Sequence, residues 1–163
     1  MNVRPPRLLA VVALAALASC SKPTKLDDLP LSGVEGLVTR QSTRGFEDTF
    51  NRLRSAIEAN PALSIVTVVD HASNAQRVGM QLPPSRLIIV GNATQGTPLI
   101  RSDRTMGIDL PQKFLVFQET DGRILVAYND PIYLSRRHHV NGQDAVLQQM
   151  STGLRQLAEE ATR

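Results

Sequence analysis

Apolar side chains at helical spacing predict two long helices in this chain. In the first, four apolar residues follow one another at intervals of three or four positions and so share one face: Phe46, Phe50, Leu53 and Ile57. The dipeptide Asn60-Pro61 ends this helix, because proline disfavours helical backbone in the residue before it. A second helix is expected from about residue 143 to residue 161, with one apolar face: Leu147, Met150, Leu154, Leu157 and Ala161.

Runs of β-branched and other apolar residues predict about five strands between and beside these helices. The predicted strands are residues 35–41, 64–69, 86–90, 113–118 and 123–128. Asp121-Gly122 separates the last two and is a hairpin turn signal, so these strands should pair antiparallel.

Polar and proline-containing turns predict three shorter helices. One opens within residues 70–74, with Asn74 or Ser73 as its cap. Another follows Asp130-Pro131, where Asp130 can cap the helix and Pro131 fits its first turn. A third should begin at Thr97-Pro98, after a loop over residues 91–96. The whole pattern predicts an α+β fold: a single two-layer domain with a mixed sheet of about five strands and helices packed on one face.

The amino-terminal residues have the pattern of an export signal. Arg4 and Arg7 precede an apolar run over residues 8–17, and small residues then lead to Cys20. The run is too short to cross a membrane as a helix, which needs about 20 residues. Residues 17–20 resemble a bacterial lipobox, which implies cleavage before Cys20 and fatty acylation, including palmitate, of that residue. An ordinary cleaved signal followed by a free cysteine is the alternative.

We therefore expect a signal peptide in residues 1–19, the acylated Cys20 with a tether in residues 20–33, and one domain in residues 34–163. Ser21, rather than an aspartate, after the cysteine favours the outer membrane, facing the periplasm. Cys20 is the only cysteine, so its acylation leaves no thiol for a disulfide, a catalytic nucleophile or a metal site. Without the arginines of the leader the charges nearly balance, which gives no electrostatic footprint for nucleic acid.

Eight polar residues stand at the ends of predicted elements and are our candidates for ligand binding: Asp70, His71, Asn92, Thr97, Lys113, Asn129, Asp130 and His138. Ends of neighbouring strands can meet at one edge of a sheet, so we hypothesise that these side chains converge there, with Asp70 orienting His71. Each residue also has a structural interpretation as a cap, a buried hydrogen-bond partner or a solvated side chain. The three histidines have no spacing typical of a metal site, and no metal is expected.

The glycine-rich stretch VGNATQGTP, residues 90–98, follows a predicted strand and precedes a predicted helix, which is the context of phosphate-binding loops. It matches neither the Walker pattern nor GxGxxG, and it has no lysine. A structural turn, or contact with an anion or another ligand, explains the glycines. The nucleophile elbow GxSxG of serine hydrolases is absent from the sequence.

Several motifs in combination resemble the bacterial and archaeal domain-of-unknown-function family 302, over about residues 36–161. They are Asp70-His71, Asn74-Ala75, Gly79, Leu82-Pro83-Pro84, Gly91-Asn92, Gly96-Thr97-Pro98-Leu99, Asp109-Leu110-Pro111, Lys113, Tyr128-Asn129-Asp130-Pro131 and Arg137-His138. The resemblance implies a compact α+β domain that forms homodimers in part of the family, and it implies no established activity. Relatives usually have Phe, Pro and Met where this chain has Val90, Ala93 and Ile100. A pocket lined by these positions would therefore differ in shape here.

These observations lead us to expect a lipid-anchored envelope protein whose domain binds a small ligand or a protein partner without catalysis. The alternative is an enzyme, or a metal- or haem-binding protein, that uses His71 and His138 as proton carriers or ligands. A purely structural or dimerisation module is a third possibility. The expected partners are the membrane through lipid on Cys20, a second copy of the chain, and an unidentified small molecule or envelope protein. The sequence does not identify a cofactor, a substrate or a reaction.

Overall fold

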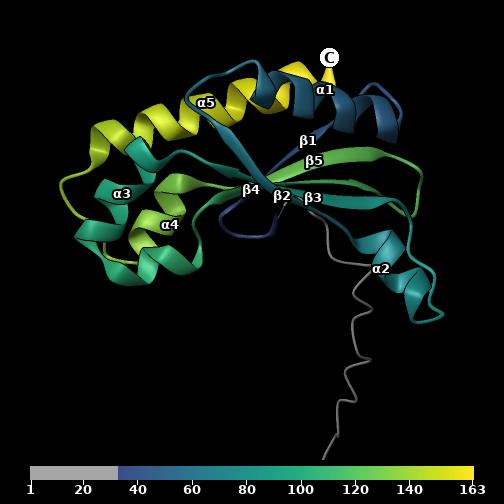
Figure 1. Ribbon diagram of the computed structural model, residues 1–163, viewed down its shortest axis with the longest axis horizontal. Helices are drawn as coiled ribbons and strands as arrows, with labels where there is room; N and C mark the ends of the chain where they lie inside the picture. Colours follow the sequence, from purple (N-terminus) through teal and green to yellow (C-terminus); the bar gives the residue numbers. More distant parts are fainter. Residues whose placement is uncertain (1–32) are drawn as a thin grey trace, which may run out of the picture.

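The computed structural model describes residues 33–163, in which helices and strands alternate (Figure 1). The strands of this part of the chain are β1 (Leu37–Gln41), β2 (Ser64–Asp70), β3 (Ser85–Gly91), β4 (Gln112–Gln118) and β5 (Ile124–Asn129). Its helices are α1 (Phe46–Glu58), α2 (His71–Arg77), α3 (Ala93–Ser102), the 3-10 helix η3 (Arg104–Ile108), α4 (Pro131–Arg137) and α5 (Asp144–Thr162). The expected signal peptide, Cys20 and all but the last residue of the tether lie outside the described residues.

The strands form one sheet in the order β1-β5-β4-β3-β2. This confirms the α+β class, the number of strands and the single domain. The expectation of a mixed sheet is wrong in one respect, because every neighbouring pair is antiparallel. Parallel neighbours require a crossover across the face of the sheet. Here α1 makes such a crossover between β1 and β2, but these strands lie at opposite edges and never pair.

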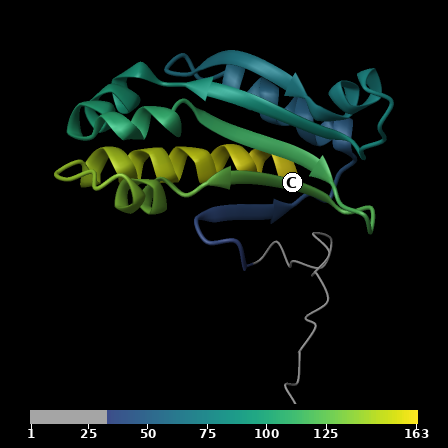
Figure 2. The same ribbon diagram turned by 90° about the horizontal axis from the view of Figure 1, so that it is seen from below.

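Helices α1 and α5 lie side by side and cover one face of the sheet, as Figure 1 shows, and seen from below the strands lie in front of both helices (Figure 2). The predicted apolar faces point into the core between the layers. Phe50, Leu53 and Ile57 of α1 are buried, as are Leu147 and Leu154 of α5. The sequence periodicity therefore identified both the helices and their buried sides.

The shorter helices lie at the two ends of the sheet. Figure 1 places α2 at one end and α3 and α4 at the other. Asp130 caps α4 as predicted, since its Oδ1 accepts a hydrogen bond of 2.9 Å from the backbone N–H of Ile132. Helix α3 begins at Ala93, four residues before the predicted Thr97-Pro98 start, because Asn92 caps it instead. Pro98 then sits inside the helix at the loss of one intrahelical hydrogen bond.

The core is continuous from the helix layer into the sheet. Phe114 and Val116 of β4 are fully buried, and the ring of Phe114 packs against that of Tyr128 with centroids 5.3 Å apart. Residues 33–163 thus have a hydrophobic core of their own, and a domain with its own core can fold without the rest of a chain. Residues 21–163 are therefore a suitable protein for measurements in solution.

Candidate functional site

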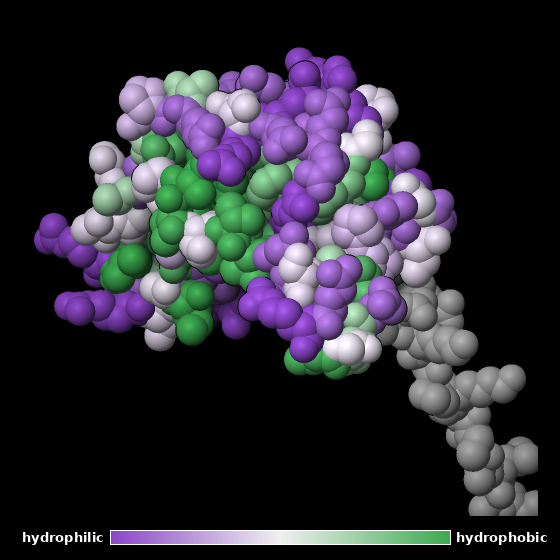
Figure 3. Space-filling view, turned by 45° about the vertical axis from the view of Figure 1, so that its right-hand side comes forward, coloured by the Kyte–Doolittle hydropathy of each residue, from purple (hydrophilic) through white to green (hydrophobic). Residues whose placement is uncertain are grey.

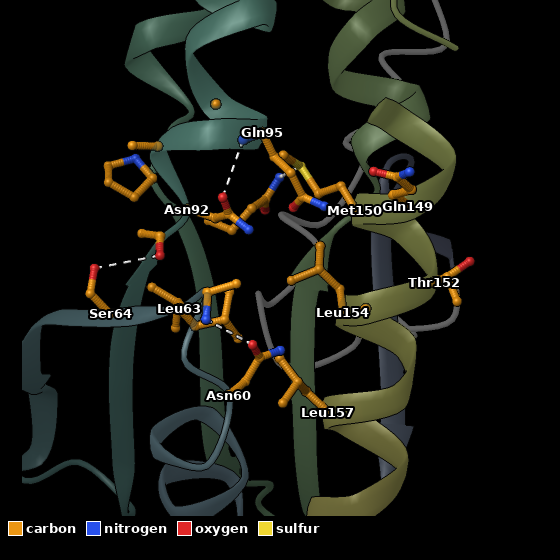
Figure 4. Close-up of a pocket in the computed structure, with 18 of the residues that line it drawn as sticks. Asn60, Leu63, Ser64, Asn92, Gln95, Gln149, Met150, Thr152, Leu154 and Leu157 are labelled. Carbon is orange, nitrogen blue, oxygen red and sulfur yellow. Dashed lines mark hydrogen bonds between the residues drawn. The ribbon is translucent and has the colours of Figure 1, made fainter. Parts of the chain in front are cut away.

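A cavity of about 1060 Å³ lies between the helix layer and one end of the sheet (Figure 4). The end of α1 and the following loop form one wall, with the start of β2 beside them. The end of β3 and the first turns of α3 form the second wall, and α5 contributes residues between Gln148 and Glu160 as the third. Segments far apart in the sequence thus enclose one space.

Apolar side chains line the inner part of this cavity. They come from α1, β3, α3, α5 and the loops beside them: Ala56, Leu63, Val90, Ile100, Leu110, Met150, Leu154 and Leu157. The space-filling view shows a hollowed apolar area bordered by hydrophilic surface (Figure 3). Val90, Ala93 and Ile100, the three positions at which the sequence departs from the resembled family pattern, all line the cavity. Its shape therefore depends on those departures.

The polar groups of the cavity are almost all uncharged. Its lining includes seven carboxamides: Asn60, Asn92, Gln95, Gln112, Gln148, Gln149 and Gln156. Glu160 is the only charged side chain among the lining residues, which include no lysine, arginine or histidine. Such a site offers hydrogen bonds to a ligand but no cation to neutralise an anion. The anion interpretation of the glycine-rich stretch therefore gains no support.

Two of the predicted candidates, Asn92 and Thr97, line this cavity. Asn92 also caps α3, because its Oδ1 accepts a hydrogen bond of 3.2 Å from the backbone N–H of Gln95 (Figure 4). The functional and structural interpretations of Asn92 are thus compatible: one end of its carboxamide holds the helix and the other faces the cavity.

His138 belongs to a separate, buried network near the same end of the sheet. It is 5% exposed, and its Nε2 lies 2.6 Å from Oδ2 of Asp109. Its Nδ1 lies 2.8 Å from Oγ1 of Thr105, which donates a hydrogen bond to Asp103. Both ring nitrogens are therefore engaged by protein groups and tie α4 to η3. This arrangement leaves no nitrogen of His138 free for a metal or a haem iron.

Three further candidates lie near this end but outside the cavity lining. Asn129 pairs with Leu37 in the β1–β5 ladder, and Asp130 caps α4. Lys113 alternates with the buried Phe114 and so points from the opposite face of the sheet. Its Nζ donates to the backbone carbonyl of Asp109 over 2.8 Å, and burial lowers the pKa of Lys113.

Asp70 and His71 lie at the other end of the sheet, so the hypothesis that all eight side chains converge is wrong. The register places Asp70 level with Val126, three strand positions away and three residues before Asn129. At spacings of about 4.8 Å between strands and about 3.3 Å along them, the Cα atoms of Asp70 and Asn129 are about 17 Å apart. Most of this distance lies across the sheet, because β3 and β4 separate β2 from β5. The remainder lies along the strands, because β2 and β5 run in opposite directions.

Asp70 has a structural partner rather than His71. Its Oδ2 accepts a hydrogen bond of 2.8 Å from Nε of Arg86. Its Oδ1 caps α2 by accepting from the backbone N–H of Ser73, so the prediction of Asn74 or Ser73 as the cap is wrong. The hydrogen bond from Arg86, followed by that from Ser73, lowers the pKa of Asp70. Arg86 also bonds Glu47 and lies over the ring of Phe46, with its guanidinium carbon 5.1 Å from the ring centroid. This cluster joins α1 to the sheet.

Most residues of the cavity lining were not predicted from the sequence. Asn60 was interpreted only as a helix end, and Gly153 and the glutamines of α5 received no role. The available signal was Gly153 itself, a glycine in the middle of an amphipathic helix with glutamines on either side. Asp109 and Thr105, the partners of His138, were also missed, although Asp109 belongs to a quoted motif.

Residues 33–163 contain no group of three or more histidine, cysteine, aspartate or glutamate side chains that could hold a metal ion. Among the helices of the same residues, none is both long enough and apolar enough to span a membrane.

Comparison with known proteins places the chain in a family. A solved neighbour, the crystal structure of an uncharacterized conserved protein DUF302 from Bacillus stearothermophilus, has a TM-score of 0.69 at 17% identity and covers 79% of this chain and 99% of its own. That similarity confirms the fold.

Curated relatives are similar over the same region. "Fluoride-specific ion channel FluC 1" of Brucella suis biovar 1 (strain 1330) is 36% identical over 119 residues, or 72% of this chain and 46% of that protein. "Fluoride-specific ion channel FluC 1" of Brucella abortus biovar 1 (strain 9-941) has the same identity and 44% coverage. The chain thus spans less than half the length of these relatives. The model described as "Domain of unknown function DUF302" matches residues 38–157, and the chain belongs to this family.

Proposed function

We propose that the protein binds an uncharged small molecule in the cavity between α1, α3 and α5, and that it does so without catalysing a reaction. The observation that carries the proposal is the composition of the lining: an apolar interior, seven carboxamides and no cation. Concave, mainly apolar sites with a few placed polar groups are the usual form of small-molecule sites.

The same lining favours binding over chemistry. In general acid–base catalysis a positioned side chain takes a proton from the substrate or gives one to it, and many such sites pair an acid with a base. Glu160 is the only titratable side chain among the lining residues, so the cavity supplies no such pair. The alternative that uses His71 and His138 is less well supported, because the two residues lie at opposite ends of the sheet and His138 is held by Asp109 and Thr105.

The location of the domain is part of the proposal. Cleavage before Cys20 and acylation of that residue would anchor the domain to the outer membrane, on its periplasmic side, and the family resemblance adds a homodimer. The fluoride-channel description belongs to the longer Brucella proteins, and the proposal does not include it.

Titration of residues 21–163 with N-phenyl-1-naphthylamine tests the binding proposal. This probe is apolar and uncharged, and its fluorescence rises when it leaves water. The proposal expects a saturable increase with one site per chain, reversed by an excess of a second uncharged apolar compound. A linear, unsaturable signal, equal to that of an unrelated folded protein, would contradict it.

A further inference from the structure

Two glycines beside the cavity have no explanation in the backbone. Gly96 lies within α3 and Gly153 within α5, and neither has the positive φ that favours glycine. Glycine inside a helix costs roughly 0.5–1 kcal/mol relative to alanine.

Packing does not require these glycines either. A Cβ added at Gly153 would have no atom within 4 Å, and one added at Gly96 would meet Cδ1 of Leu110 at 3.7 Å, an ordinary contact. Both positions line the cavity. The helices therefore have open space beside Gly96 and Gly153, and a bound molecule can occupy this space.

Two asparagines present fixed donors to the same space. Oδ1 of Asn60 accepts a hydrogen bond of 3.0 Å from the backbone N–H of Ala62, and Oδ1 of Asn92 accepts one from Gln95. Because a backbone N–H needs an acceptor, these bonds also fix which end of each carboxamide is the NH₂ group. Figure 4 shows both carboxamides at the cavity, facing the side formed by α5.

No hydrogen bond within residues 33–163 involves the NH₂ groups of these asparagines; Asn60 is exposed and Asn92 half-buried, so water solvates both groups until a ligand binds. Each is held in place by its own oxygen and so is oriented before any ligand arrives. A ligand oxygen that accepts from such a donor gains a hydrogen bond with little ordering cost.

Charge narrows the ligand further. A carboxylate or phosphate brought into this apolar space would lose hydration without meeting a cation, and it would face the carboxylate of Glu160. We infer that the ligand is an uncharged, largely apolar molecule of the amide, ester or ketone class. Its acceptor oxygens receive hydrogen bonds from Nδ2 of Asn60 and Nδ2 of Asn92. This inference rests on the proposed function and adds the ligand class and the residues that select it.

Displacement of N-phenyl-1-naphthylamine from residues 21–163 by two ten-carbon compounds tests the inference. N-methyldecanamide carries an uncharged carbonyl, and decanoate carries a charge on a chain of the same length. At pH 7 we expect the amide to displace the probe at least tenfold more strongly than decanoate does. Equal displacement by the two compounds would overturn the inference.

The variants Asn60→Asp and Asn92→Asp separate the donors from the caps. Aspartate keeps the oxygen that accepts from the backbone, and it caps helices as well as asparagine does, but it lacks the NH₂ donor. Each variant should weaken the amide about threefold to tenfold, as expected for the loss of one hydrogen bond. The matched control is Asn74→Asp on the exposed side of α2, where Asn74 bonds Arg77, and it should leave amide binding unchanged.

The probe itself serves as the internal reference, because it has no acceptor oxygen. Each aspartate adds a charge as well as removing a donor, so the affinity of the probe reports the effect of the charge and should fall by less than that of the amide in Asn60→Asp and Asn92→Asp. Unchanged amide binding in both variants, or an equal loss of probe and amide, would overturn the inference while leaving the proposed function intact. Absence of saturable probe binding to the unsubstituted chain would instead overturn the proposed function.

Discussion

Gly153 provides a perturbation whose effects on stability and on binding should have opposite signs. It lies in the interior of the 19-residue α5, with open space where a Cβ would stand. Replacement by alanine should raise the free energy of unfolding by about 0.5–1 kcal/mol, since alanine is the better helix former by that amount. Leucine has nearly the helix propensity of alanine, so Gly153→Leu should also be at least as stable as the unsubstituted chain.

Binding should separate the two variants. The methyl group of Gly153→Ala reaches only the rim of the space, and we expect less than a twofold change in the affinity for N-phenyl-1-naphthylamine. Gly153→Leu places a branched side chain within the cavity and should weaken the probe about fivefold, which corresponds to about 1 kcal/mol. A stabilised variant that loses binding cannot be explained by misfolding.

Urea unfolding followed by circular dichroism and probe titration of the same samples provide the two measurements. Destabilisation of Gly153→Ala by more than about 0.5 kcal/mol would show that the space beside the glycine is not free. Unchanged probe affinity in Gly153→Leu would show that the probe binds elsewhere. Either result would refute this interpretation of the cavity.

Three further predictions concern other parts of the chain. His138→Ala should lower the free energy of unfolding by about 2–3 kcal/mol, because the buried His138 loses two part-buried hydrogen bonds, one of them to Asp109; a loss below about 1 kcal/mol in urea unfolding would contradict this. Asp70→Asn keeps the cap of α2 but loses the ion pair with Arg86 and should cost about 1 kcal/mol at pH 7. Folding lowers the pKa of Asp70, so the ionised carboxylate stabilises the fold above its unfolded-state pKa, and this stabilisation is lost as the pH falls through the folded-state pKa. The difference in unfolding free energy between Asp70→Asn and the unsubstituted chain should therefore shrink toward pH 2. A difference that stays constant with pH would exclude the ion pair as its source. In bacteria that process lipoproteins, the full-length chain should incorporate labelled palmitate and Cys20→Ser should not; equal labelling of both would exclude Cys20 as the acylated residue.

The elements of the fold were predictable where local pattern decides them. The periodicity of apolar residues identified α1 and α5 with their buried faces, and Asp130-Pro131 identified the cap and first turn of α4. Asp121-Gly122 correctly predicted the antiparallel pairing of β4 with β5. The directions of the other strand pairs were not predictable, because they depend on which strands pair across the sheet rather than on any one strand. The start of α3 was placed too late, since Thr97-Pro98 is also a helix-start signal and only the structure shows that Asn92 caps first.

The candidate site was predictable only in part. Asn92 follows the end of β3 and Thr97 lies within α3, and both line the cavity, so the rule that polar residues gather at the ends of elements found part of one wall. The same rule failed for Asp70 and His71, because neighbouring antiparallel strands finish at opposite ends of the sheet. The other walls of the cavity come from helices that are distant in the sequence, and small side chains on these helices leave the space open. The partners of His138 lie about thirty residues away in the sequence. Neither feature has a local signature.

Chemical-shift mapping by NMR tests the central claim most directly, because it locates the bound molecule. In residues 21–163 titrated with N-methyldecanamide, we expect saturable shifts of the backbone amides of Asn60, Asn92, Gly96 and Gly153, with residues of α2 at the far end of the sheet unchanged. The side-chain NH₂ resonances of Asn60 and Asn92 should move with the same binding curve. Shifts confined to α2, or to the face of the sheet that carries Lys113, would contradict a ligand site between α1, α3 and α5.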